Sequence, residues 1–180
     1  GRHDEITKNN PYQESFRVPF LVRWPGKIAP RQDDLLISTP DIYPTLLGLV
    51  GAGTAIPRQV EGRDLSSLLL GRPGERPAFQ PYYFIPNGSE KKRDIRGVRT
   101  LEYTLAVNGR DPEMPVQLFD HAADPFELHN LAAEKPEVVA ELLQKQLIPW
   151  LEKTQDPWLA EAGPRLASLL GLSPKKDSTP

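Results

Sequence analysis

The chain contains no cysteine among its 180 residues, and it has only one methionine, Met114. Without thiols it holds no disulfide scaffold, thiol nucleophile, zinc knuckle or iron–sulfur site. It also lacks an excess of either charge: 22 Lys+Arg face 24 Asp+Glu, for a net charge of −2. This balance predicts no nucleic acid partner held mainly by charge. No apolar run approaches the roughly 18 residues of a membrane-spanning helix, so we expect no membrane partner.

Proline and glycine are abundant instead, at 20 and 13 residues. Their usual combined share is about 12%, so many turns and irregular segments are expected. The chain opens on Gly1 without a charged and then apolar leader. We therefore expect a piece of a longer protein whose functional machinery is incomplete in these residues.

The first part of the chain predicts two strands and two helices. Apolar residues on both faces of Val18–Trp24 are typical of a strand buried in an α/β sheet, and Leu35–Ile37 reads as a shorter strand. Asp41 is placed to cap a helix that ends near Val50, with Pro44 in its first turn. A second, shorter helix is expected after Asp64, and the turn residues between Gly71 and Pro81 indicate a subdomain boundary.

The second part predicts a short antiparallel sheet followed by a helix. The strands are expected at Tyr82–Ile85, Ile95–Thr100, Tyr103–Val107 and Val116–Phe119, with turns at Asn87-Gly88 and Asn108-Gly109. A single apolar stripe then runs from Pro136 to about Thr154, and Pro149 predicts a kink or an early end near Leu147. The composition of residues 173–180 is that of a disordered tail.

Polar residues gather immediately before the first predicted strand. They include His3, Lys8, Asn9, Asn10, Tyr12, Glu14 and Arg17. In α/β sheets, ligands meet the chain at strand ends and adjoining loops. A lysine ammonium and an imidazole suit a tetrahedral sulfate or phosphate. Taken alone, these residues favour a solvated loop in which Glu14 and Arg17 pair structurally.

Several blocks, in one order across residues 1 to 153, closely resemble the sulfatase family, the formylglycine-dependent, arylsulfatase-like members of the alkaline-phosphatase-like superfamily. The first block reads Lys8-Asn-Asn-Pro-Tyr-Gln-Glu-Ser-Phe-Arg-Val-Pro-Phe-Leu-Val-Arg-Trp-Pro-Gly26. The next are Thr39-Pro-Asp-Ile-Tyr-Pro-Thr-Leu-Leu47 and Glu61-Gly-Arg-Asp-Leu65. The last are Arg96-Gly-Val-Arg-Thr100, Leu118-Phe-Asp120, Asp124-Pro-Phe-Glu127 and Asn130-Leu-Ala132.

The resemblance implies a fold and a site. It implies an α/β chain, the C-terminal part of an alkaline-phosphatase-like fold, with a small subdomain of antiparallel strands packed on a terminal helix. Residues 1–72 would end the large domain, residues 73–155 would form the subdomain, and residues 156–180 would be a partly disordered extension. Lys8 matches the active-site lysine that contacts sulfate. His3 falls near a family histidine and is expected to bind substrate, although Asp4 replaces the usual glycine and Gln13 a commoner glutamate.

The family's nucleophile and metal ligands are absent from this sequence. Relatives convert the first residue of a Cys/Ser-x-Pro-x-Arg motif to formylglycine and hold calcium between aspartates and an Asp-Asn or Asp-His couple. No such motif occurs here, so formylglycine and calcium are implied for an upstream part, with no metal and no cofactor in this chain. One lysine can bind a sulfate but cannot turn it over. We therefore expect the isolated chain to be inactive.

Two other groups of residues are candidates. Arg96 and Arg99, with nearby Lys91, Lys92 and Arg93, follow Tyr82 and Tyr83, and such a set could bind an anionic sugar by charge and stacking. A solvated basic turn explains the same residues, and strand alternation puts the two arginines on opposite faces. His121 and His129 lie near Asp120 and Asp124, which hints at a metal. A turn at Asp124-Pro125 and a cap from Asn130 explain that segment more economically.

The expected reaction is hydrolysis of an organic sulfate monoester, carried by a carbohydrate, with a sulfated small molecule or glycan as partner. The alternatives are a phosphodiesterase or phosphonate hydrolase of the same superfamily and a non-catalytic sugar-binding or assembly module. The truncated sheet predicts an apolar edge that pairs with the missing N-terminal part or self-associates. The sequence does not determine the compartment; export of many relatives implies a periplasmic or secreted parent.

Overall fold

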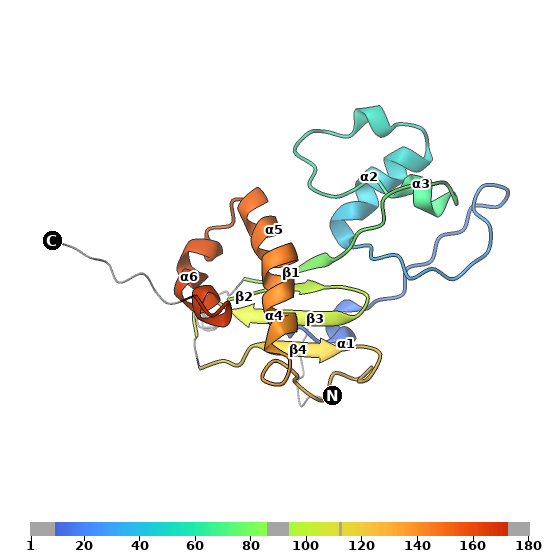
Figure 1. The fold of residues 1–180 in the computed structure, drawn as a ribbon. Helices are drawn as coiled ribbons and strands as arrows, with labels where there is room; N and C mark the ends of the chain where they lie inside the picture. Colours follow the sequence, from blue (N-terminus) through green and yellow to red (C-terminus); the bar gives the residue numbers. More distant parts are fainter. Residues whose placement is uncertain (1–9, 86–93, 112, 173–180) are drawn as a thin grey trace. The chain divides into compact units, whose positions relative to one another are not determined.

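A computed structural model of the chain describes residues 10–85, 94–111 and 113–172 (Figure 1). The predicted site residues His3 and Lys8, the turn at Asn87-Gly88 and residues 173–180 therefore lie outside the described residues. Contacts divide the chain into two compact units. The first joins the chain up to Val18 with the chain from Pro81 onward, and the second spans Pro19–Gln80. The domain boundaries of the longer protein stay a prediction.

A four-stranded sheet organises the first unit, in the order β1 (Gln80–Phe84), β2 (Ile95–Arg99), β3 (Tyr103–Asn108) and β4 (Gln117–Asp120). β2 pairs with β3 and β3 with β4, both antiparallel. All four predicted strands are thus confirmed, with ends shifted by one or two residues. Gly97 allows β2 to approach β3 closely, because a Cβ there would lie 2.1 Å from the Leu105 carbonyl oxygen.

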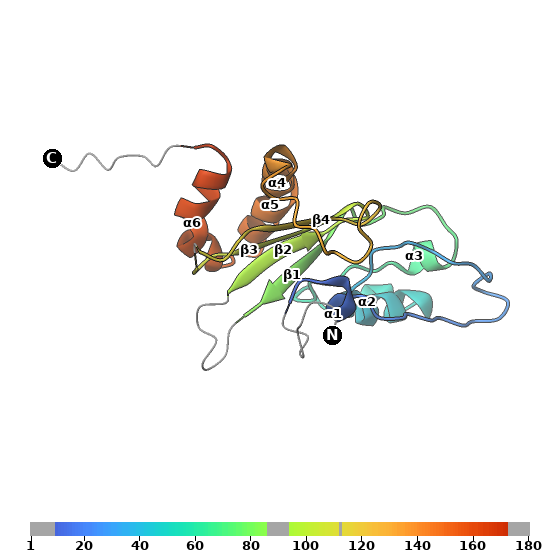
Figure 2. The ribbon, with the colours of Figure 1, turned by 90° about the horizontal axis from the view of Figure 1, so that it is seen from below.

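One long helical segment covers one face of this sheet (Figure 2). It consists of α4 (Pro136–Leu142), a π-helical turn η3 (Leu143–Leu147) and α5 (Ile148–Lys153). The wider π turn lies immediately before Pro149, whose missing N–H and ring disturb an α-helical ladder. The predicted distortion near Leu147 is confirmed, and so is the buried stripe, with Val139, Leu142, Leu143, Leu147 and Leu151 all buried.

A further helix, α6 (Trp158–Leu169), lies within the predicted terminal extension and was not expected from the sequence. Its Trp158, Ala162 and Leu166 side chains are buried, which makes the helix part of the core. Gly163 and Pro164 interrupt the helical pattern in the sequence, and this hid the amphipathic stripe. The Trp158 indole N–H donates to the Asp94 carbonyl oxygen at 2.8 Å, joining α6 to the entrance of β2.

Arg96 carries the electrostatic link between β2 and the start of α6. Its side chain is 6% exposed, and its Nε lies 2.7 Å from Asp156 Oδ2 while Nη1 lies 2.7 Å from Asp94 Oδ1. The guanidinium also lies against the Tyr83 and Trp158 rings, at 5.1 and 5.7 Å from their centroids. Two carboxylates and two aromatic rings thus compensate for removing this cation from water.

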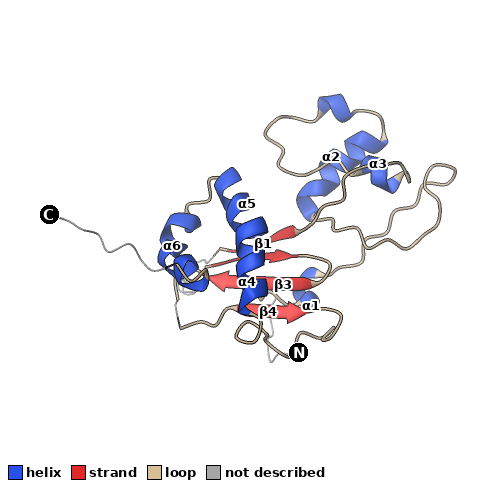
Figure 3. Cartoon of the chain, viewed as in Figure 1, coloured by secondary structure: helices blue, strands red, loops and turns tan. Residues whose placement is uncertain are grey.

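The two strands predicted at Val18–Trp24 and Leu35–Ile37 are wrong, because the described chain forms no strand at these residues (Figure 3). Val18, Phe20, Leu21 and Val22 are exposed, Leu21 to 93%. A strand needs a neighbour to accept and donate its ladder hydrogen bonds. Within the described residues the sheet consists of β1 to β4, so this apolar segment has neither a pairing strand nor a covering layer.

Buried Asp41 holds the second unit together. Helix α2 (Thr39–Leu49) begins after Ser38, so Asp41 is the third helical residue and completes a capping box rather than serving as the predicted N-cap. Its carboxylate also accepts the Arg63 backbone N–H at 2.8 Å and the Gln80 side-chain N–H at 2.9 Å. A Cβ at Gly62 would lie 1.9 Å from the Pro40 carbonyl oxygen, so the block after Glu61 packs directly on the start of α2.

Two other short helices complete the unit: η1 (Gly53–Ala55) and α3 (Ser66–Leu69). α3 confirms the predicted helix after Asp64. Its approach to α2 is fixed by Thr45, whose hydroxyl donates to the Arg63 carbonyl at 3.2 Å and accepts the Leu65 N–H at 3.0 Å. The two family-like blocks at Thr39–Leu47 and Glu61–Leu65 thus have a structural role, because they hold α2 and α3 together.

Asp156→Asn tests the buried ion network. Burial raises the pKa of Asp156, but the Arg96 guanidinium and the Trp158 backbone N–H outweigh it and hold the pKa below the ordinary value of 3.8. The stabilisation is therefore present above about pH 4 and lost as pH falls through the lower folded-state pKa. We expect Asp156→Asn to lower the free energy of unfolding by about 3 kcal/mol at pH 7, measured by denaturant titration, with the gap from wild type closing in acid.

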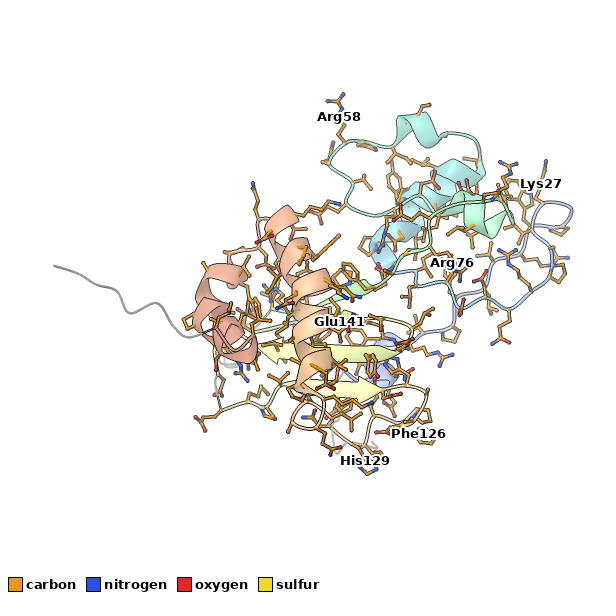
Figure 4. The ribbon with its side chains drawn as sticks, in the orientation of Figure 1. Lys27, Arg58, Arg76, Phe126, His129 and Glu141 are labelled. Carbon is orange, nitrogen blue, oxygen red and sulfur yellow. The ribbon has the colours of Figure 1, made fainter. Side chains whose placement is uncertain are left out.

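The matched control is Glu141→Gln, which breaks the exposed i,i+4 pair between Glu141 on α4, labelled in Figure 4, and Lys145 on η3. Exposed pairs contribute little, so its unfolding should match wild type. A loss of equal size in both variants, or a loss for Asp156→Asn that does not depend on pH, would contradict a dominant role for the Arg96 network.

Candidate functional site

The short helix α1 (Gln13–Phe16) lies on the sheet face opposite α4 and α5 (Figure 2). It begins five residues after Lys8 in the sequence. A buried amide, Asn10, shapes its entry: the Asn10 Oδ1 accepts the Tyr12 N–H at 3.3 Å and the Ser15 hydroxyl at 2.6 Å. The polar segment predicted to contain the site is therefore folded from Asn10 onward rather than a solvated loop.

Aromatic contacts seat both ends of α1 on the sheet. The Tyr12 ring lies 5.5 Å from that of Phe119 on β4, and the Phe16 ring meets Tyr82 on β1 edge-on at 4.3 Å. The Tyr12 hydroxyl also accepts the Gln117 side-chain N–H at 3.3 Å. The side chains on either end of α1 therefore reach both outer strands of the sheet.

A buried carboxylate fixes the first residue of α1. Glu127 lies in the loop after β4 and is 1% exposed. Its Oε2 accepts the Gln13 backbone N–H at 2.6 Å, and its Oε1 accepts the Thr104 hydroxyl of β3 at 3.0 Å. The Nε2 of His121 lies 3.4 Å from the same Oε1. Charge-assisted bonds of this kind are about twice as strong as neutral ones, which offsets the cost of burying the charge.

Arg99 supplies the positive charge of this cluster and packs against His121. The Arg99 guanidinium contacts the His121 ring, and the ring nitrogens of His121 lie 3.2 Å from the Leu101 carbonyl oxygen and 2.9 Å from the Thr104 hydroxyl. Burial lowers the pKa of Arg99 to about 10; Glu127 opposes this shift and Arg17 adds to it. Arg99 thus stays charged at neutral pH, and the Glu127 carboxylate is a counter-charge that acts on it.

The two arginines predicted to bind substrate lie on opposite faces of β2, as strand alternation indicated. Arg99 lies on the α1 side, next to residues after Lys8, whereas Arg96 lies on the α6 side between Asp94 and Asp156. An anion bound by Arg96 would have to displace one of these carboxylates. Substrate contact by either arginine stays a prediction, and Lys91, Lys92 and Arg93 lie outside the described residues.

The loop that follows β4 is built by turn chemistry. Asp124 Oδ2 accepts the His129 N–H at 2.7 Å, and Asn130 Oδ1 accepts the N–H groups of Leu118 and Ala132 at 3.0 and 3.1 Å. The predicted turn at Asp124-Pro125 is confirmed, whereas Asn130 closes an Asx-type turn instead of capping a helix, because α4 begins only after Lys135. Phe126 and His129 lie on the outside of this loop (Figure 4). Among the described residues, no group of three or more histidine or acidic side chains is arranged to hold a metal ion.

The described residues contain no helix long and apolar enough to cross a bilayer.

The small antiparallel sheet is covered by helices on one face and carries α1 on the other. This arrangement is that of a C-terminal sulfatase subdomain, and comparison with known proteins bears this out. Residues 1–155 match the family model described as N-sulphoglucosamine sulphohydrolase, C-terminal. The chain therefore belongs to the sulfatase family, as a C-terminal portion of an α/β, alkaline-phosphatase-like fold.

Similar proteins carry sulfatase names. The chain is 41% identical to an endo-4-O-sulfatase of Bacteroides thetaiotaomicron over 86% of its length and 33% of the relative's, and 38% identical to an ulvan-active sulfatase of Formosa agariphila over 89% and 30%. A solved 4S sulfatase, from work on the metabolism of multiple glycosaminoglycans by Bacteroides thetaiotaomicron, superposes with a TM-score of 0.74 at 39% identity, covering 88% of this chain and 35% of that one. The chain thus spans about a third of the length of these relatives.

Sequence reasoning missed the role of Glu127. The residue stands in a turn-rich, polar segment, where a glutamate is normally solvated. It belongs to a block that resembles the family, but block membership gives no indication of burial. Only the packing of the loop against β3 and α1, segments far apart in the chain, brings its carboxylate to the Gln13 N–H.

Gln13→Pro tests the bond between α1 and Glu127. Proline fits the first residue of a helix, and Tyr12 has the extended backbone that suits a residue before proline (φ −76°, ψ 152°). The substitution removes the N–H that Glu127 accepts. We expect faster hydrogen exchange at the Phe16 and Arg17 amides, and about 2 kcal/mol less stability, since a hydrogen bond to a charged group is lost. Gln13→Ala keeps the N–H and serves as the control. Equal hydrogen exchange in both variants would show that the bond to Glu127 does not stabilise α1.

Proposed function

We propose that this chain is the C-terminal part of an enzyme that hydrolyses organic sulfate monoesters. The support that carries the proposal is the match of residues 1–155 to the family model, which includes the block beginning at Lys8. In the reaction, Lys8 binds the sulfate oxygens and offsets the charge that grows on them in the transition state. Preorganised donors of this kind commonly contribute a factor of about 100 to 1,000 in rate.

The remaining chemistry belongs to the upstream part. Formylglycine supplies the nucleophile when present, and calcium supplies a Lewis acid; the residues that hold them are not in this chain. His3 and Arg99 are proposed to bind the anionic substrate, Arg99 from its place beside α1. The chain alone is therefore proposed to bind weakly and to have no turnover.

A sulfated glycan is the proposed substrate class. One similar protein is named for activity on ulvan, another is an endo-4-O-sulfatase, and a similar structure comes from work on glycosaminoglycans. A phosphodiesterase or phosphonate hydrolase remains the second candidate because the superfamily shares its metal-assisted chemistry. The lysine block itself would serve either tetrahedral group.

The upstream part of the same protein is the proposed partner of the segment Val18–Val22. Four apolar side chains of this segment are exposed, and the relatives are about three times as long as this chain. An apolar segment of this kind becomes stable when a sheet pairs with it on one edge and helices cover its faces.

Lys8→Ala in the protein extended upstream tests the catalytic assignment. We expect sulfate release from a sulfated oligosaccharide to fall by about 100-fold or more, since the oxyanion loses a charged donor. Lys27→Ala, at an exposed lysine of the second unit, is the control and should leave the rate unchanged (Figure 4). A near-wild-type rate for Lys8→Ala would remove Lys8 from the site, and faster hydrolysis of a matched phosphodiester would favour the second candidate.

Leu21→Ser tests the proposed partner segment, because the substitution should be harmless in the isolated chain and destabilising in the extended protein. In the isolated chain, Leu21 is 93% exposed, so the substitution should reduce self-association without loss of stability, measured by analytical ultracentrifugation. In the extended protein the same residue is expected to be buried, and Leu21→Ser should lower stability by about 2 kcal/mol or more. Equal effects in the two proteins would show that the upstream part does not cover the segment.

A further inference from the structure

We infer that Glu127 is a positioning residue for the catalytic lysine: its buried carboxylate sets the place of the segment that follows Lys8. The inference rests on the proposed function. Glu127 touches neither substrate nor reacting atoms in this account; it acts through the Gln13 N–H, five residues after Lys8 in the sequence.

Helix α1 cannot hold this position by itself. It has four residues, far below the roughly 12 to 15 that an isolated helix needs. Its first N–H groups have no partner inside the helix, and the one at Gln13 is accepted by Glu127 Oε2 at 2.6 Å. Of the contacts that seat α1 on the sheet, this one is directional, charged and made to the backbone, at a residue five positions after Lys8 in the sequence. It therefore sets the register of the segment along the sheet in a way that ring contacts do not.

The placement of Glu127 is costly for a residue that serves only packing. Its backbone has a φ of 54°, in the left-handed region that disfavours residues with a side chain, and its carboxylate is buried. An apolar residue at the same place would bury more cheaply. Strain and a buried charge together are typical of positions held for function.

The other carboxylate oxygen ties the arrangement to the sheet. Thr104 of β3 donates to Oε1, and His121 at the end of β4 lies beside it. Since β3 is a central strand, Glu127 fixes the segment that follows Lys8 relative to the sheet of the subdomain. A displacement of about 1 Å in a catalytic group can cost 100-fold in rate, so a modest slip of α1 is enough to affect catalysis.

A double-mutant cycle in the extended protein tests this inference, with kcat and KM measured for sulfate release. We expect Glu127→Ala to lower kcat at least tenfold and Lys8→Ala to lower it more. If Glu127 acts through Lys8, adding Glu127→Ala to Lys8→Ala should cause little further loss, because coupled residues are not additive. Glu127→Gln retains an oxygen that can accept the Gln13 N–H and should restore much of the rate. Glu141→Ala, at an exposed position of α4, is the matched control.

The outcomes separate this inference from the proposed function. Large losses for Lys8→Ala and Glu127→Ala that multiply in the double variant would overturn the positioning role and leave the function standing. An unchanged rate for Lys8→Ala would overturn both. Should Glu127→Ala fail to fold, Gln13→Pro compared with Gln13→Ala removes the same bond from the other side. The Pro variant should then lose kcat at least tenfold more than the Ala variant, and equal rates would overturn the inference.

Discussion

The bond between the Glu127 carboxylate and the Gln13 N–H is the contact on which the arrangement of the lysine segment depends. It joins residues 114 positions apart and holds a helix too short to exist alone. The cost of removing the carboxylate from water is offset by a threonine hydroxyl and a histidine from two neighbouring strands. The antiparallel sheet and the helices behind it form the rigid support that lets one loop residue place a distant segment.

The positive charges of Arg96 and Arg99, on opposite faces of the sheet, are compensated differently. On the helical face, Arg96 is shared by two carboxylates and two rings, so its charge is compensated within the fold. On the α1 face, the half-buried Arg99 is opposed by the Glu127 carboxylate, which Thr104 and Gln13 already engage. The first arrangement fastens α6 to β2. The second leaves positive charge beside the segment that leads from Lys8, where an anionic substrate is proposed.

The second unit shows why an apolar pattern does not by itself make a strand. Val18–Trp24 has the composition of a strand buried on both faces, but its side chains are exposed and no ladder forms. Strand formation depends on partners that supply hydrogen bonds and cover the apolar faces. Under the proposal made above, the upstream part of the protein supplies those partners, and the pattern then describes an environment that the described residues do not provide.

Local signals were enough for the strands of the sheet, for the helix after Pro136 with its disturbance near Pro149, and for the turn at Asp124, because each depends on neighbours in the chain. The order of the family blocks was enough to recognise a sulfatase portion. Tertiary structure alone decided which charged side chains are buried and which groups they contact. Arg96 pairs with Asp94 and Asp156, Asp41 accepts the Arg63 N–H, and Glu127 accepts the Gln13 N–H. Burial of a charge is set by segments distant in sequence, and no local pattern carries that information.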